Sequence, residues 1–106
     1  MNPLLAPILK QLKQDLNSVY GDRLYSLTLF GSQARGDSES GSDIDILVVL
    51  TSLVNPGEEV KRTGKIVADL SLQYDVVISC LFMDKTYYQT RHSALLKNIR
   101  KEGVLL

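Results

Sequence analysis

The chain has 106 residues, with 12 basic and 12 acidic side chains, and therefore no formal net charge. This length fits one domain over residues 1–106, and the neutral balance excludes the broad basic coat of a general nucleic-acid binder, so we expect no stable nucleic-acid complex. The single cysteine, Cys80, excludes a disulfide framework. Because no apolar run is long enough to span a membrane and no signal peptide is visible, we expect a cytoplasmic protein.

The first third of the chain predicts a helix, a strand and a tight turn. Apolar residues recur at three- and four-residue steps over Pro3–Tyr20, which predicts an amphipathic helix. Arg23–Phe30 is rich in aliphatic and aromatic residues and predicts a strand. Gly31 ends this strand, residues 32–35 open a short helix, and the polar residues 37–41 predict a loop.

The remainder predicts two more strands and two more helices. The aliphatic run Ile44–Leu50 predicts a strand buried on both faces. Glu58–Leu72 predicts a helix, Asp75–Phe82 a third strand, and Lys85–Lys101 a last helix. Residues 104–106 are long enough for a short edge strand. This alternation of helices and strands indicates an α/β domain.

The turn that begins at Gly31 has the composition of a phosphate site. Glycine lets the backbone approach a ligand closely, and the amide groups at a helix start attract anions. Ser32 adds a hydroxyl donor, and Arg35, one helical turn later, is a candidate for a charged contact with phosphate or for a clamp between the turn and the acids that follow. By itself, a Gly-Ser pair is more often a plain strand-to-helix turn.

Two carboxylates follow this turn at a spacing that suits metal binding. Alternate strand residues project to one face, so Asp43 and Asp45 lie side by side, with Cα atoms roughly 6.5 Å apart. Such a pair suits Mg²⁺. If the third strand lies beside the second, Asp75 adds a third acid, and three carboxylates can seat two ions roughly 4 Å apart. The alternative is a solvated pair of acids at a strand edge, with Asp75 a turn residue.

The run Gly31-Ser32-Gln33-Ala34-Arg35-Gly36-Asp37, followed by Ser42-Asp43-Ile44-Asp45, resembles the signature of the DNA polymerase β-like nucleotidyltransferases. It is most similar to the minimal nucleotidyltransferases, or MNT domains, of bacteria and archaea. The resemblance implies a polymerase β-like palm, a small mixed sheet flanked by about four helices. It implies metal-binding catalytic acids at Asp43, Asp45 and Asp75, and nucleotide-binding positions at Gly31, Ser32, Arg35 and Ser42.

The resemblance also implies a reaction and a partner. Stand-alone MNT domains are commonly antitoxins paired with a helical HEPN-domain RNase toxin, to whose tyrosine they transfer AMP from ATP. For this chain it implies Mg²⁺, with two ions, ATP as substrate, a HEPN partner, and a homo- or hetero-oligomer. Two alternatives remain open: transfer to a small molecule such as an aminoglycoside, and a non-catalytic antitoxin that neutralises by binding.

Overall fold

A four-stranded mixed sheet forms the centre of the protein, seen here in a computed structural model that describes residues 5–36 and 43–106. The strands lie in the order β3-β2-β1-β4. β1 pairs antiparallel with both β2 and β4, and β2 pairs parallel with β3. Their bounds are β1 Leu24–Phe30, β2 Ile44–Leu50, β3 Ile78–Asp84 and β4 Val104–Leu105. The sheet is therefore mixed, as the resemblance implies, and β3 lies beside β2.

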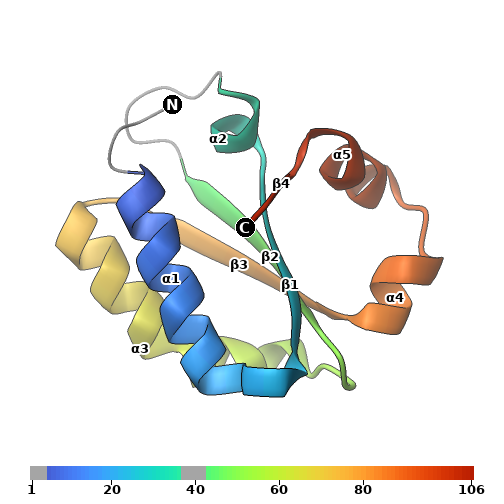
Figure 1. Cartoon of the computed structure of the whole chain (residues 1–106), viewed down its shortest axis with the longest axis horizontal. Coiled ribbons are helices and arrows are strands. Elements are labelled where there is room, and N and C mark those ends of the chain that lie inside the picture. The colour runs from blue at the N-terminus through green and yellow to red at the C-terminus, as the bar shows by residue number, and fades with distance from the viewer. Residues whose placement is uncertain (1–4, 37–42) are drawn as a thin grey trace.

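Five α-helices surround this sheet in the described part of the chain. Figure 1 shows α1 and α3 together on one face, α4 and α5 together on the other, and α2 at the end of β1. Their bounds are α1 Leu5–Tyr20, α2 Ser32–Arg35, α3 Pro56–Tyr74, α4 Lys85–Thr90 and α5 Ala94–Glu102, and a single 3₁₀ turn, η1 Gly21–Arg23, joins α1 to β1. Because α3 connects two parallel neighbours, it is the crossover that such a pair requires.

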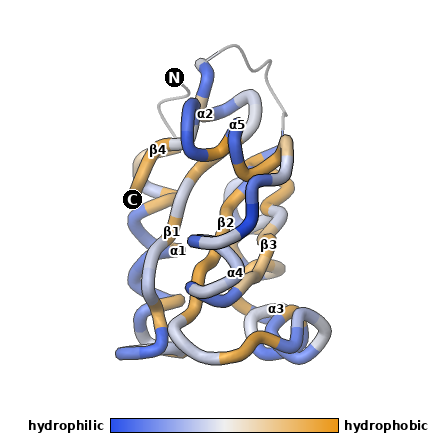
Figure 2. The backbone as a smooth tube through the Cα atoms, turned by 90° about the vertical axis from the view of Figure 1, so that its right-hand side faces the viewer, coloured by the Kyte–Doolittle hydropathy of each residue, from blue (hydrophilic) through white to orange (hydrophobic). Residues whose placement is uncertain are grey.

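The core has two parts because β2 is buried on both faces. Ile44, Ile46, Val48 and Leu50 face a large apolar cluster with α1 and α3. Leu47 and Val49 face a smaller one with the inner residues of α5. Figure 2 shows the hydrophobic segments concentrated on the central strands. The continuous aliphatic run of β2 is therefore explained by burial on both faces of the sheet, as predicted.

A buried carboxylate joins α1 and α3 at the end of the sheet away from α2. The side chain of Glu59 is 3% exposed. It accepts a hydrogen bond of 2.9 Å from the Tyr20 hydroxyl and lies 3.5 Å from Arg23 and 3.4 Å from Arg62. Burial, with the neighbouring carboxylate, raises the pKa of Tyr20 above its ordinary value. A carboxylate can be buried in this way only because its hydrogen-bond and ion-pair partners compensate for the hydration that it loses.

The single helix predicted over Lys85–Lys101 is wrong, because the chain forms two helices there. α4 ends at Thr90, and Arg91 is extended. Ser93 then caps α5, its hydroxyl accepting the amide hydrogen of Leu96 at 3.2 Å. This cap satisfies an amide group at the start of α5. In one continuous helix, that amide would instead bond to a carbonyl of the preceding turn. The break turns α5 back across the sheet, which opens a cleft between α4 and α5.

The other differences are in element bounds. α3 begins and ends two residues beyond the prediction, with Asn55 as its N-cap. The start predicted for the first helix and the loop at residues 37–41 lie outside the described residues. None of the helices described is long and apolar enough to cross a membrane.

Candidate active site

The turn after β1 lies directly against one of the two predicted acids. Phe30, the last residue of β1, pairs with Asp45 in β2, so Gly31 follows at the same end of the sheet. Gly31 has φ 76°, in the region that favours glycine. A Cβ on Gly31 would lie 2.5 Å from the Asp45 Oδ2 atom. The absence of a side chain is therefore what lets the turn and the carboxylate approach each other.

The short helix α2 carries the other turn residues. It starts at Ser32 and ends where Gly36 takes a left-handed conformation, as predicted. The amide groups of Ala34 and Arg35 bond to the Gly31 carbonyl. The Arg35 guanidinium lies 3.5 Å from the Glu102 carboxylate of α5, and both side chains are about two-fifths exposed. This exposed ion pair contributes little stability.

Asp43 and Asp45 form a pair of like charges at the start of β2. Asp45 is the second residue of the strand and is partly buried, whereas Asp43 precedes the strand and is exposed. Burial, and secondly the negative charge of Asp43, raises the pKa of Asp45. Neither carboxylate has a hydrogen bond or ion pair to another described side chain. A cation between the two would relieve this repulsion.

Asp75 does not take the predicted place in the third strand. It caps α3 with a left-handed backbone, φ 53°, and β3 starts only at Ile78, which pairs with Ile44. Its side chain is exposed. Residues 5–36 and 43–106 contain no group of three acidic, histidine or cysteine side chains that could hold a metal ion. The described residues therefore do not bring the three predicted acids into one metal-binding group. The reason is that α3 continues to Tyr74 and β3 starts only at Ile78.

Ser42 and Gln33 are the remaining positions of the run that carries the turn and the acids. Ser42 lies outside the described residues. Gln33, which the sequence reasoning did not select, is buried in α2 with 5% of its surface exposed. A glutamine in a polar turn gives no signal of burial, because burial here comes from the packing of α2 on the sheet. The available sequence signal for a role in the turn was its position inside the Gly-Ser run.

Comparison with known proteins assigns this arrangement to a family. The family described as "Nucleotidyltransferase domain" matches residues 9–106. The chain is 38% identical over 79 residues, 74% of this chain and 79% of the relative, to a Methanocaldococcus jannaschii protein named "Putative protein adenylyltransferase MJ0141". Two other proteins of that organism carry the same kind of name.

Solved structures share the fold at low sequence identity. A structure described as a toxin-antitoxin with AMP-PNP has a TM-score of 0.63 at 18% identity, covering 93% of this chain and 69% of that one. A tri-AMPylated Shewanella oneidensis HEPN toxin in complex with MNT antitoxin matches with a TM-score of 0.50 at 15% identity, covering 92% and 70%. The mixed sheet, the glycine turn against Asp45 and the family match agree, and the chain belongs to the nucleotidyltransferase domain family.

Proposed function

We propose that this protein transfers AMP from ATP to a tyrosine hydroxyl of a partner protein, and that the partner is a HEPN-domain toxin which the transfer neutralises. The relative from Methanocaldococcus jannaschii is named as a protein adenylyltransferase, which supports a protein acceptor. The toxin-antitoxin structures that share the fold support the kind of partner. A reaction that consumes ATP suits the cytoplasm, where we propose that it takes place.

Asp43 and Asp45 are the proposed magnesium ligands. Mg²⁺ is commonly held by one or two carboxylates together with substrate phosphates, and the two acids offer this donor set without a competing partner among the described side chains. The residues therefore fit the ion. Asp75 lies outside such a group, so a second ion remains a prediction for metal titration to test.

Gly31, Ser32, Arg35 and Ser42 are the proposed contacts for the triphosphate. The turn brings the backbone of Gly31 beside Asp45, Ser32 follows as the first residue of α2, and Arg35 supplies a positive charge one helical turn away. Bound magnesium supplies positive charge that stabilises the phosphates as negative charge develops during transfer. The tyrosine oxygen then forms a bond to the α-phosphorus, and the bond between this phosphorus and the oxygen that bridges to the β-phosphate breaks. Pyrophosphate leaves with that oxygen, and the tyrosine proton passes to water.

One observation carries this proposal: the position of Gly31 against the Asp45 carboxylate. A triphosphate held at the turn would lie beside the acids that hold its magnesium, since any Cβ at Gly31 would come within 2.5 Å of Asp45 Oδ2. This proximity supports the proposal that the turn and the acid pair form one site. Holding reacting groups in place in this way is a large part of catalysis.

The test is transfer of label from ATP radiolabelled at its α-phosphate to a co-expressed HEPN-domain protein, with Mg²⁺ present. We expect labelling of a tyrosine, loss of labelling with chelator, and loss in the Asp43→Asn/Asp45→Asn double variant. Asp22→Asn is the matched control, because Asp22 is exposed in η1 at the other end of β1. Full labelling by the folded double variant would contradict the proposed role of the pair.

Neutralisation in cells separates catalysis from simple binding. If AMP transfer is the mechanism, cells that express the toxin with the Asp43→Asn/Asp45→Asn variant will stop growing, whereas the Asp22→Asn variant will protect them. Protection by the double variant at normal expression would favour an antitoxin that acts by binding alone.

A further inference from the structure

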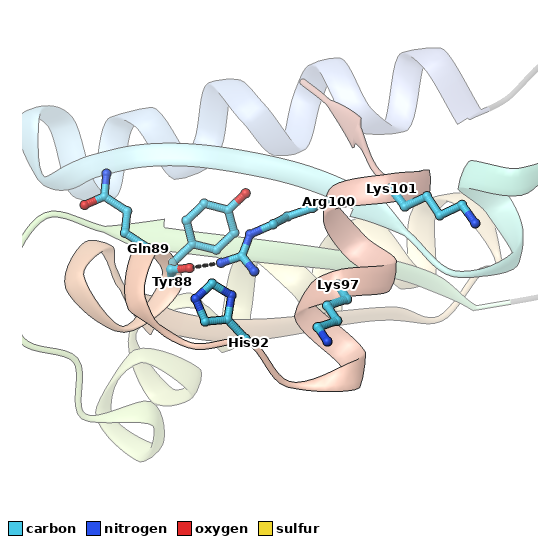
Figure 3. Close-up of a pocket in the computed structure, with 6 residues that line it drawn as sticks. All are labelled: Tyr88, Gln89, His92, Lys97, Arg100 and Lys101. Atoms are coloured by element: carbon cyan, nitrogen blue, oxygen red, sulfur yellow. Dashed lines mark hydrogen bonds between the residues drawn. The ribbon is translucent and has the colours of Figure 1, made fainter.

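A cleft of about 620 Å³ lies between α4 and α5, outside the turn and the acid pair. Its lining comes from the end of α4, the break that follows it, and the outer face of α5 (Figure 3). The lining residues are Tyr88, Gln89, His92, Lys97, Arg100 and Lys101. The volume is in the range of ligand-binding clefts.

The lining is basic although the chain is neutral. Three permanent cations and one histidine line the cleft, and no acidic side chain of the described residues joins them. The whole chain has no formal net charge, so this excess is local. A local excess of one sign attracts ligands of the opposite sign.

Arg100 forms a fixed wall of the cleft. Its guanidinium donates hydrogen bonds to the carbonyl oxygens of Arg91 and Tyr88, and its Cζ atom lies 5.1 Å from the centre of the Tyr88 ring. Figure 3 shows this group directed into the space between the two helices. These contacts hold α5 against the end of α4 and keep the cleft open in one shape.

Lys97 and Lys101 are the cations of the cleft that are available to bind a ligand. Both are exposed and lie one turn apart on α5. Neither has an ion pair within residues 5–36 and 43–106. Lys65 on α3 differs, because its ammonium group lies 3.5 Å from the Asp69 carboxylate. The two ammonium groups of α5 therefore meet a ligand without first giving up a protein partner.

The basic cleft borders the candidate active site. Lys101 is followed by Glu102, whose carboxylate lies 3.5 Å from the Arg35 guanidinium of α2. α2 starts at the turn that holds Gly31 against Asp45. A chain that lies along α5 would thus arrive at the proposed site of transfer.

We propose that the cleft between α4 and α5 docks an acidic segment of the acceptor protein, through Lys97 and Lys101. The assignment of a protein acceptor rests on the function proposed above. A peptide fits better than a nucleic acid, because a phosphate backbone needs an extended basic track, whereas this patch covers one face of one short helix on a neutral chain.

The test measures binding of a fluorescent peptide, with one tyrosine flanked by glutamates, by anisotropy and without nucleotide or magnesium. We expect it to bind at about 0.05 M salt, more weakly at about 0.5 M, and better than the same peptide with glutamines. Affinity for the glutamate peptide should fall about tenfold in the Lys97→Glu/Lys101→Glu variant. Lys97→Gln/Lys101→Gln, which only neutralises the charges, should give a smaller loss and serves if the first variant does not fold.

The matched control is Lys61→Glu/Lys65→Glu, because these exposed lysines have the same spacing on α3. This control should bind the glutamate peptide as the unaltered protein does. Equal losses in both double variants, or equal binding of both peptides, would overturn the proposal. A single-stranded oligonucleotide that binds more tightly than the peptide through Lys97 and Lys101 would also overturn it, in favour of nucleic acid. Because no nucleotide is present, failure of AMP transfer leaves this measurement unaffected.

Discussion

Replacing Gly31 with alanine tests the central contact of the candidate site. An alanine Cβ would lie 2.5 Å from Asp45 Oδ2, whereas ordinary contacts begin at 3.4 Å, so the two groups must separate by about 0.9 Å. A displacement of about 1 Å at a reacting centre can reduce a rate about 100-fold. The backbone at Gly31, with φ 76° and ψ −158°, lies in a region open essentially to glycine alone, which adds about 1–3 kcal/mol of strain for alanine. We therefore expect a folded variant with about 100-fold lower transfer.

Gly36→Ala is the control that separates strain from displacement. Gly36 also has a positive φ, 74°, but its ψ of 10° places it in the left-handed region, and no described atom lies within 4 Å of an added Cβ. Gly36→Ala should lose about 1 kcal/mol in urea unfolding, no more than Gly31→Ala, while retaining its transfer rate. The readouts are incorporation of labelled AMP into the partner and calorimetric binding of AMP-PNP with Mg²⁺. Transfer at the normal rate by Gly31→Ala would refute the reasoning.

Three further predictions concern residues outside that contact. Asp75→Asn, which keeps a side chain that tolerates the left-handed backbone, should retain magnesium affinity in a metal titration, whereas Asp45→Asn should lose it; equal losses would restore Asp75 to the site. Glu59→Ala should lower the free energy of unfolding by about 3 kcal/mol, since it leaves the Tyr20 hydroxyl and two arginines without their buried partner; Tyr20→Phe should cost only about 1 kcal/mol, and the reverse order in urea unfolding would contradict this account. Burial raises the pKa of Cys80 from 9.0 to about 11, so its stabilising contribution is complete below pH 9.0 and is lost as pH rises to about 11; unfolding curves should show Cys80→Ala losing less stability over that interval than the unaltered protein.

Local chemistry made several features predictable from the sequence. The continuous aliphatic run of β2 requires burial on both faces, and the structure buries it so. Glycines at positions 31 and 36 bound α2 because both adopt positive φ. The order of the turn and the two acids indicated a nucleotidyltransferase, and the family match confirms it. These signals lie within a few residues of one another, where the sequence constrains the backbone directly.

Local patterns misled wherever packing at a distance decides the outcome. Val60 has the apolar character of a buried helix residue but is 56% exposed, while its neighbour Glu59 is 2% exposed. The reason is that Tyr20, Arg23 and Arg62 come from three elements to meet the carboxylate. The spacing along α3 records only Arg62, three residues after Glu59, and not Tyr20 or Arg23.

The sequence by itself determined the family, the central strand and the residues of the turn and the acid pair. Only the tertiary structure decided that Gly31 abuts Asp45, that Asp75 remains at the end of α3, and that α4 and α5 line an open basic cleft. The physical reason is that a turn or a strand follows from neighbouring residues, whereas contact between elements depends on how β1, β2 and α5 pack together. Chemistry at this site depends on contacts of that second kind.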